Sequence, residues 1–281
     1  MLSGVRSGGI SAMDQLEPTF YLGTHEVSWL WRTEVPLMVS HRRLRSRRHL
    51  RPALGPVVID SGGFSELSLY GWWRTSEPAY GRAVERYVAE LGSVVWAAPQ
   101  DWMCEPEIIA KTGLSVYEHQ ARTVGNYLRL TEDWPGLPFI PVLQGWSLAD
   151  YLRCVELYEA AGVRLASLPV VGVGSVCRRQ DTRFAEALFR ELHAAGLRTH
   201  AFGVKTAGLA RYGRFVASSD SLAWSYRARR SQAMAGHSHR SCANCLDFAL
   251  SWRERLCSRV SVQQLGLFDG TPLAGLECGD V

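Results

Sequence analysis

The feature that most constrains this chain is a short apolar run that passes directly into a polar turn, VVIDSGGF, at residues 57–64. Its apolar part, Val57–Ile59, contains only β-branched residues without polar alternation, which is typical of a parallel strand covered on both faces. The two glycines that follow indicate a tight turn where the backbone approaches another group closely. Because α/β proteins hold their ligands at the carboxyl ends of parallel strands, Asp60 is a candidate site residue. The alternative is that Asp60 only caps the next helix.

The same pattern of an apolar run ending in polar residues or glycine recurs along the chain. Strands are predicted at Phe20–Thr24, Pro36–Ser40, Val57–Asp60, Val94–Pro99, Phe139–Leu143, Leu168–Val173, Thr199–Val204 and Phe215–Ser218. Helices are predicted at Pro78–Leu91, Val116–Leu130, Leu148–Ala161 with Ser147 as its cap, Asp181–Ala195 and Gly208–Tyr212. This regular alternation predicts an α/β fold, a (β/α)8 TIM barrel. An open doubly wound sheet is the alternative, but no GxGxxG motif follows the first strand.

From the third strand onward, each predicted strand ends in a polar or glycine-containing turn. These turns read DSGGF, QDW, QGW, GVGS, GVK and SSDS. In a parallel barrel they all face the same mouth, where the active site of such folds lies. The polar side chains expected to meet there are Asp60, Asp101, Gln144, Lys205 and Asp220.

Positive charge is concentrated in one short segment. The chain has 281 residues, of which 47% are hydrophobic, so it can build one large α/β domain or two small ones. Its formal net charge is only +4, yet residues 41–51, HRRLRSRRHLR, contain six arginines. We expect this segment to be helical and exposed, and to bind nucleic-acid phosphates through Arg42, Arg43, Arg47 and Arg48. A helix face that contacts only solvent is the alternative.

The cysteines and the N-terminal sequence bear on the compartment. Residues 1–13 are rich in glycine and serine and too polar for a secretory signal, and no apolar run is long enough to span a membrane. The seven cysteines are an odd number, and two form a C-x-x-C pair, which favours metal binding over disulfides. We therefore expect a reducing, cytoplasmic compartment.

The C-x-x-C pair lies in a cluster of metal-ligand types, His237, His239, Cys242 and Cys245. Four nitrogen and sulfur donors within nine residues can close a tetrahedral structural zinc site. Cys257, one helix later, is the reserve ligand in place of His237. The alternative to a metal site is an incidental cysteine pair.

In chain order, these motifs resemble those of the tRNA-guanine transglycosylase superfamily over roughly residues 20–255. They are most similar to the branch that inserts 7-deazaguanines into DNA, the deazapurine-DNA-modification proteins. The segments that carry the resemblance are IDSGGF, WAAPQDWMCEP, PVLQGW, GVGSVCRRQ, FGVKT and CANC. DSGGF alone is moderately specific, whereas the whole set in this order with the Cys/His cluster is highly specific.

The resemblance implies base exchange at a glycosidic carbon, in which one carboxylate attacks C1′ and a second group moves the proton of the base. Asp220 matches the nucleophile of the family, and Asp60 matches its general acid/base. Asp101 and Gln144 match the positions that read the guanine-like edge, whose ring N–H and amine a carboxylate accepts together. The other positions expected to bind substrate are Ser61, Gly62, Gly63, Phe64, Gly145, Gly172, Gly174 and Lys205.

The metal cluster departs from the C-x-C-x-x-C pattern of the tRNA enzymes. His237, His239 and Cys242 keep that relative spacing with different ligand types, and Cys245 adds a fourth donor. We expect the zinc to be structural, because base exchange needs no open metal position.

The expected organisation is a disordered N-terminus at 1–18, a catalytic barrel at 19–235, a zinc-binding element with a helix at 236–258 and a flexible tail at 259–281. The expected activity replaces guanine in DNA by a 7-deazaguanine such as preQ0, with the target base flipped out of the stack. The alternatives are the same chemistry on tRNA and a non-catalytic nucleic-acid-binding zinc protein. A metal-dependent hydrolase is disfavoured, because the strand ends lack the histidines that its site needs.

The tail contains QLGLF at Gln264–Phe268, which resembles the peptide by which bacterial DNA polymerases and repair proteins bind the sliding clamp. Such a peptide docks in extended form, with its glutamine at the rim and its large apolar side chains in pockets. The alternative is that Leu265, Leu267 and Phe268 fold back over the bottom of the barrel.

Overall fold

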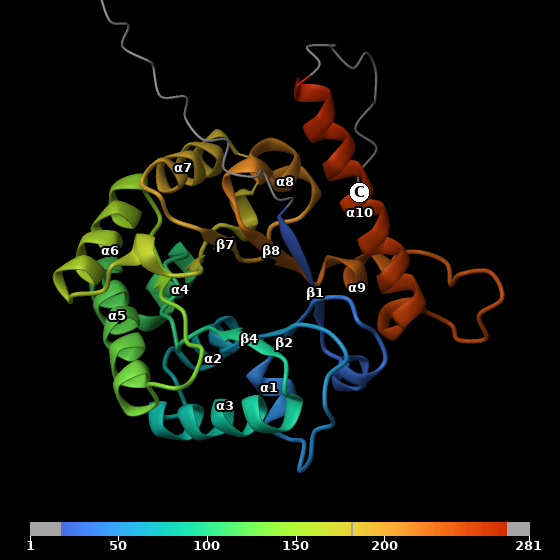
Figure 1. Ribbon diagram of the computed structural model, residues 1–281, viewed down its shortest axis with the longest axis horizontal. Coiled ribbons are helices and arrows are strands. Elements are labelled where there is room, and N and C mark those ends of the chain that lie inside the picture. Colours follow the sequence, from blue (N-terminus) through green and yellow to red (C-terminus); the bar gives the residue numbers. More distant parts are fainter. Residues whose placement is uncertain (1–17, 181, 269–281) are drawn as a thin grey trace, which may run out of the picture.

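A computed structural model describes residues 18–180 and 182–268, with side chains described up to Arg259. Eight parallel strands form one curled sheet in the order β4-β3-β2-β1-β8-β7-β6-β5 (Figure 1). Their bounds are β1 Thr19–Thr24, β2 Leu37–Ser40, β3 Val57–Asp60, β4 Val94–Ala97, β5 Val142–Leu143, β6 Val171–Val173, β7 Thr199–Ala201 and β8 Ser218–Ser221. The α/β class and the eight parallel strands predicted from the sequence are confirmed.

The edge strands β4 and β5 are linked by a short bridge ahead of β5. Ala97 at the end of β4 pairs in parallel with Phe139. The Ala97 amide donates to the Pro138 carbonyl at 2.9 Å, and the Ile140 amide donates to the Ala97 carbonyl at 3.1 Å. The sheet therefore curls around a central axis, in the manner of a TIM barrel.

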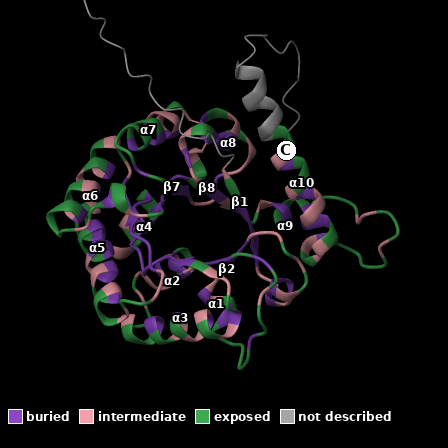
Figure 2. Cartoon of the chain, viewed as in Figure 1, coloured by how far each residue is buried: buried purple, intermediate pink, exposed green. Residues whose placement is uncertain are grey.

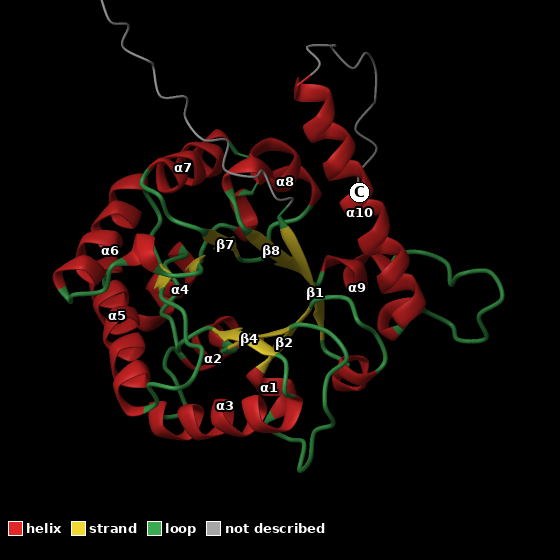
Figure 3. Cartoon of the chain, in the orientation of Figure 1, coloured by secondary structure: helices red, strands yellow, loops and turns green. Residues whose placement is uncertain are grey.

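Helices surround the sheet on its outer face (Figure 3). Their bounds are α1 His41–Leu44, α2 Gly63–Tyr70, α3 Glu77–Leu91, α4 Pro106–Thr112, α5 Val116–Asp133, α6 Leu148–Ala160, α7 Arg183–Ala194, α8 Thr206–Tyr212, α9 Ala223–Ala228 and α10 Leu246–Phe268. The Ser147 cap predicted for α6 is confirmed, since its hydroxyl accepts from the Asp150 amide while the Asp150 carboxylate accepts from the Ser147 amide. This reciprocal capping box satisfies two amides that the first helical turn leaves free.

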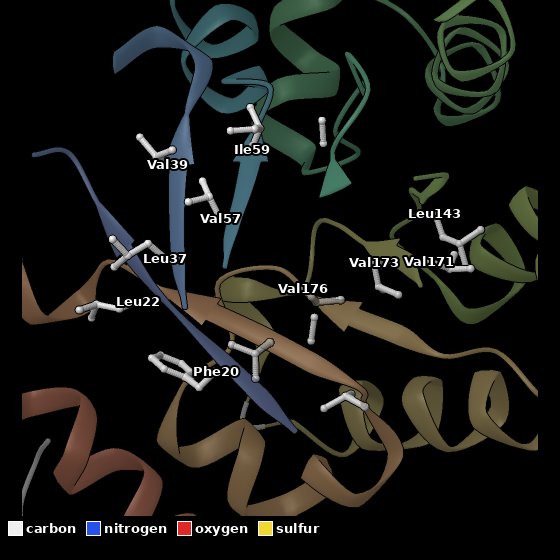
Figure 4. Packing of buried hydrophobic residues seen from close by; sticks show 14 of the residues in the cluster. Phe20, Leu22, Leu37, Val39, Val57, Ile59, Leu143, Val171, Val173 and Val176 are labelled. Atoms are coloured by element: carbon white, nitrogen blue, oxygen red, sulfur yellow. The ribbon is translucent and has the colours of Figure 1, made fainter. Parts of the chain in front are cut away.

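Alternate residues of the strands enter two different apolar cores. Val57 and Ile59 belong to the core between the sheet and the helices (Figure 4). Val58 between them belongs to the second core, inside the barrel. Tyr21 and Trp96 also fill the interior of the barrel. Both faces of the sheet are thus buried, as the buried strands in Figure 2 show, which explains why the strand sequences lack polar alternation.

Most arginines of the basic segment are exposed, as predicted, but the segment is not the predicted helix. Only His41–Leu44 is helical, and the chain then runs without regular structure to β3. Leu44 and Leu50 are buried, and the Leu50 amide donates to Glu90 of α3 at 2.8 Å. The chain leaves β2 at one end of the barrel and must return to the other end to begin β3. It therefore crosses α3 without regular secondary structure.

Two other boundaries differ from the prediction. Strand β8 is Ser218–Ser221, so Asp220 lies within the strand and not after it. The strand is defined by its pairing with β1, which runs from Thr19 opposite Ser218 to Leu22 opposite Ser221. This paired segment is polar, so an apolar run in the sequence could not indicate it. Helix α10 continues to Phe268, so the chain is helical past the predicted start of the tail at residue 259.

The predicted disordered N-terminus, except Pro18, and residues 269–281 lie outside the described residues. The backbone of Gln264–Phe268 forms the end of α10 and is not the extended peptide expected for clamp binding. No helix among the described residues combines the length and the apolar character needed to cross a membrane.

Candidate active site

A pocket of about 270 Å³ lies at the carboxyl ends of the strands. Four acids line it: Asp60 at the end of β3, Asp101 and Glu105 between β4 and α4, and Asp220 in β8. The other lining residues are Gly23, Thr24, Met38, Ser40, Gly63, Phe64, Met103, Gln144, Gly174, Ser175, Cys177, Phe202, Gly203 and Leu222. The strand-end residues Asp60, Asp101, Gln144 and Asp220 are therefore brought together, as the parallel strands require.

Asp60 is held by the turn that follows it. Gly62 has φ +89°, a left-handed conformation that favours glycine, and it directs the chain into α2. Burial raises the pKa of Asp60 above that of an ordinary aspartate, against hydrogen bonds from Ser40 and the Gly62 amide, and the nearby charge of Asp220 raises it further. Because the pKa is raised, Asp60 can hold a proton at a pH where an exposed aspartate is ionised.

Asp101 lies beside two donors. Gln144 Nε2 donates to Asp101 Oδ2 at 2.5 Å, and the Ser61 hydroxyl donates to Oδ1 at 3.2 Å. Burial, followed by the charge of Asp60, raises the pKa of Asp101 to about 7, although both donors favour its ionised form. Asp60 and Asp101 therefore influence each other's ionisation, as two carboxyl groups that share one site do.

Ser175 connects Glu105 to Gln144, a link that sequence reasoning missed. Its hydroxyl oxygen lies 2.7 Å from Glu105 Oε2 and 2.7 Å from Gln144 Oε1, and it accepts from the Cys104 amide at 2.9 Å. One hydroxyl carries one proton, so it can donate to only one of these two oxygens. Burial raises the pKa of Glu105, which favours the protonated carboxyl that can donate to Ser175.

The consequence is a directed chain of hydrogen bonds. When Glu105 donates to Ser175, Ser175 donates to Gln144 Oε1, and the amide of Gln144 must present Nε2 to Asp101. The orientation of Gln144 is thereby fixed. Ser175 also has φ +55°, a left-handed conformation uncommon outside glycine.

Asp220 is anchored through one oxygen. The Gly203 amide donates to Asp220 Oδ1 at 2.8 Å, and His200 Nε2 lies 3.3 Å from the same atom. Among the described residues, no hydrogen bond is made to Oδ2. One oxygen therefore fixes the carboxylate, and the other is available to a ligand in the pocket.

His200 was not identified from the sequence. It is fully buried inside the barrel, where its Nδ1 lies 2.9 Å from the Ser218 hydroxyl and its ring is flanked by Trp96 and Phe202 at 4.7 Å each. The signal that could have indicated it is a histidine in the middle of the buried strand THAFGV, on the face that points into the barrel.

The remaining predicted substrate residues divide into two groups. Gly63, Phe64 and Gly174 line the pocket, whereas Ser61, Gly62, Gly145, Gly172 and Lys205 do not. A Cβ on Gly145 would lie 2.9 Å from Asp150 and Tyr151 of α6, so this glycine permits close packing of a helix. Lys205 donates its amide to Gln180 at 2.8 Å just before α8.

The predicted phosphate-binding arginines are spread out. The side chain of Arg42 lies beside Gly62, and so borders the turn that carries Asp60. Arg43, Arg47 and Arg48 are exposed, and the carbonyl of Arg47 accepts from Arg86 of α3, away from the pocket turn. Of the four, Arg42 is the one shown beside the turn that carries Asp60, and it is not a lining residue of the acidic pocket.

The predicted metal ligands lie together in the segment between α9 and α10. One donor atom from each of His237, His239, Cys242 and Cys245 lies within 4.8 Å of the other three. Two pairs of donor atoms are closer, with His239 Nε2 at 3.1 Å from Cys242 Sγ and His237 Nδ1 at 3.5 Å from Cys245 Sγ. A tetrahedral zinc ion with ordinary bond lengths separates its ligands by about 3.4–3.8 Å. Two nitrogens and two sulfurs at these distances fit a metal ion, and Cys257 is not part of the group.

The segment with these four residues packs against α9, which follows the strand of Asp220, and against the turn after β1. Ser225 of α9 donates to the Ala243 carbonyl at 3.0 Å, and His25 after β1 lies 2.7 Å from Asn244. The His25 ring stacks on Trp224, whose indole donates to the Gly23 carbonyl in the pocket wall at 2.8 Å. A metal ion in the cluster would hold α9 against β1 and so support one wall of the pocket.

Fold and pocket together define an α/β protein with a TIM-like sheet and an acidic site at the carboxyl ends of its strands. The sequence model of the DpdA family, described as DeoxyPurine in DNA protein A, matches residues 16–272. The chain therefore belongs to the DpdA family, in agreement with the deazapurine-DNA-modification branch that its motifs indicated. None of the curated proteins matches the chain.

Among solved structures, the chain is similar to an amidohydrolase from Burkhoderia ambifaria with bound zinc, at 17% sequence identity and a TM-score of 0.34. The similarity covers 67% of this chain and 56% of the amidohydrolase, so the chain spans little more than half the length of that structure. A likeness at this level carries no inference about activity or metal.

Proposed function

We propose that this protein is a transglycosylase that replaces guanine in DNA with a 7-deazaguanine, through a covalent intermediate on Asp220. The observation that carries the proposal is the meeting of Asp60, Asp101 and Asp220 in one pocket of a DpdA-family chain. Because the family description refers to deoxypurines in DNA, DNA is favoured over tRNA as the polynucleotide. The target guanine must leave the base stack to enter the pocket.

Base recognition is assigned to Asp101 and Gln144. An ionised Asp101 accepts from the ring N–H and the exocyclic amine of the base, a pattern that guanine and 7-deazaguanine share. The hydrogen bonds from Glu105 through Ser175 hold Gln144 in the orientation that presents Nε2 to Asp101. The site thus selects the edge that both bases have in common, as an exchange reaction requires.

The chemical step needs one nucleophile and one proton donor. Asp220 Oδ2 attacks C1′ while the C1′–N9 bond breaks, and the departing guanine takes its proton from Asp60. The incoming 7-deazaguanine then gives its N9 proton to Asp60, and N9 attacks C1′ to release Asp220 as a carboxylate. The proton and the electron pair return to their starting places, so the exchange requires no other reactant. The raised pKa of Asp60 supports its role as the acid of the first step.

A metal ion would be structural in this reaction. His237, His239, Cys242 and Cys245 would hold it, and all four positions would be filled by protein. We propose zinc because a closed set of two histidines and two cysteines suits it. Substrate DNA would approach past Arg42, beside the Asp60 turn, with the neighbouring arginines as further phosphate contacts.

The direct test is exchange of radiolabelled guanine into or out of polynucleotides. DNA duplexes, DNA single strands and tRNA are incubated separately with the protein and the 7-deazaguanine base. Release of guanine from DNA in proportion to incorporated 7-deazaguanine supports the proposal. Release from tRNA alone would assign the tRNA activity, and release from neither would overturn base exchange.

A further inference from the structure

A small hollow of about 60 Å³, separate from the acidic pocket, lies where α8, α9 and α10 meet. Its lining residues are Thr206, Arg227, Trp252, Arg255, Leu256 and Arg259. Three guanidinium groups from two helices and one hydroxyl thus surround it, with Trp252 and Leu256 as buried apolar walls. This combination of donors is suited to a single oxyanion.

No ion pair between described side chains neutralises the positive charge around this hollow. None of the ion pairs between described side chains involves Arg227, Arg255 or Arg259. The surrounding sequence from residue 223 to 259 contains seven arginines and only two acids. Like charges around one hollow repel each other, and a bound anion removes that repulsion.

The hollow adjoins the acidic pocket along the chain. Thr206 follows Gly203 by three residues, and Gly203 lines the pocket and donates to Asp220. Three residues of chain span at most about 11 Å. One DNA strand rises by about 3.4 Å per nucleotide, so this span corresponds to about three nucleotides.

We propose that this hollow binds one backbone phosphate of the DNA strand, within about three nucleotides of the base held in the acidic pocket. The inference rests on the proposed function, because it places DNA over that pocket. Planar guanidinium groups donate in pairs to phosphate oxygens, which favours arginine here. Arg227 of the hollow lies in α9, which follows β8, and the basic segment 41–51 follows β2. Because β8 and β2 are the two neighbours of β1, the DNA strand would be held on both sides of β1.

The test uses DNA strands that contain a single guanine, with one phosphate at a time replaced by a neutral methylphosphonate. Wild-type protein should lose affinity by roughly 10- to 100-fold at one position within about three nucleotides of the guanine. The triple variant R227Q/R255Q/R259Q should bind unmodified DNA weaker by a similar factor and be insensitive to that replacement. Its log–log salt dependence should fall by about 0.7 to 0.9.

The matched control is R164Q/R190Q/R198Q, which removes the same charge from exposed arginines remote from the mouth, with melting temperatures of both variants measured. The control should bind DNA like wild type and keep its sensitivity to the replaced phosphate. Wild-type binding that no single replacement weakens, or equal losses in both variants, would overturn the proposal. Inorganic phosphate that saturates the hollow at micromolar concentration, without any effect of methylphosphonates, would instead identify a free-anion site.

Guanine exchange is measured on the same strands, so that the two proposals fail separately. If wild type exchanges the base and the triple variant exchanges and binds equally well, only the phosphate site is wrong. If wild type shows the position-dependent loss of affinity but exchanges no base, the phosphate site stands and the proposed function is wrong.

Discussion

The two ends of the barrel hold hollows of similar size and different chemistry. The hollow at the carboxyl ends of the strands, about 270 Å³, is lined by four acids. The hollow at the amino ends, about 250 Å³, is lined mostly by apolar residues such as Tyr21 and Val170, and Arg198 is the one charged residue among its described lining residues. Size therefore does not define the site. The polar turns after the strands do, because parallel strands bring all of them to one end.

His200 lies between these two hollows and contacts a residue of each. Its Nδ1 faces Ser218, which lines the amino-end hollow, and its Nε2 faces Asp220, which lines the acidic pocket. If the Ser218 hydroxyl donates to Nδ1, the neutral ring carries its proton on Nε2 and donates to Asp220. The hydrogen bond from Ser218 would then fix the orientation of the His200 ring. The Nε2 proton of that ring would contact Asp220, the carboxylate that we propose reacts.

The strongest contrast between the two ends should come from single substitutions. Asp220→Asn and Asp60→Asn should each lower guanine exchange by at least roughly 10³-fold, because each removes a reacting group. Arg198→Gln at the amino end should leave exchange within about twofold of wild type. Steady-state release of labelled guanine measures all three. Near-normal exchange by Asp220→Asn would show that the nucleophile has been misassigned.

Loss of the metal should destabilise the wall of the acidic pocket that contains α9 more than the rest of the barrel. Chelation should lower the melting temperature and abolish exchange, because metal binding contributes folding free energy to the segment that holds α9. Cys242→Ser should lose the bound metal, whereas the matched control Cys257→Ser should keep it. Metal content by mass spectrometry and melting curves report the result. An unchanged melting curve after chelation would mean that the cluster is not a metal site.

Substitution of His200 tests whether a residue inside the barrel contributes to the activity of Asp220 in the acidic pocket. His200→Leu should lower exchange by roughly 10- to 100-fold by freeing Asp220 from one donor, with little change in affinity for DNA. His200→Gln, whose amide can donate to Asp220, should recover part of the lost kcat. Separate measurement of kcat and KM distinguishes this role from general destabilisation. Equal activity of the leucine and glutamine variants would argue for simple packing.

The pH dependence should distinguish Asp101 from the acids that do not read the base. Burial raises the pKa of Asp101 in the folded protein to about 7, well above that of an ordinary aspartate, so in the unliganded protein it is protonated below about pH 7. Binding of the free 7-deazaguanine base should weaken by up to about tenfold per pH unit below that point, because the protonated carboxyl no longer accepts from both base donors. Calorimetric titration between pH 5.5 and 8.5 measures this. Asp101→Asn should bind weakly with a flat pH profile, and a wild-type profile equally flat would refute the assignment.

The same pKa shift has a consequence for stability. Asp101 binds a proton more tightly in the folded than in the unfolded chain, so the protonated form is favoured by folding. Its contribution is therefore most favourable below about pH 4 and is lost as pH rises through about 7. The acidic pocket thus costs stability at the pH where we expect it to act, as preorganised sites commonly do.

Much of this site followed from the sequence because strand direction is a strong constraint. Asp60, Asp101 and Gln144 each lie at the end of a predicted buried strand or within two residues of it, and parallel strands carry such residues to one mouth. Asp220 was predicted from its motif and from the end of a strand at Phe215–Ser218, but the strand itself lies further along, at the serine-rich Ser218–Ser221. Its position is set by pairing with β1, which no local pattern encodes.

The parts that could not be predicted depend on contacts between distant segments. Glu105 belongs to the site through Ser175, which is 70 residues away. The basic segment is mostly not helical because it must cross α3, where Leu50 finds a partner in Glu90, 40 residues further along the chain. Helix propensity is a weak preference and gives way to such tertiary contacts.

The central claim is that Asp220 becomes covalently bound to the DNA sugar. The measurement is peptide mapping by mass spectrometry after the protein is incubated with DNA and denatured without added 7-deazaguanine. We predict a sugar adduct on the tryptic peptide of residues 215–227, which contains Asp220. Asp60→Asn should form that adduct more slowly, because the departing guanine then lacks its proton donor, and Asp220→Asn should form none. An adduct on the peptide that contains Asp60, or one that persists in Asp220→Asn, would contradict the account.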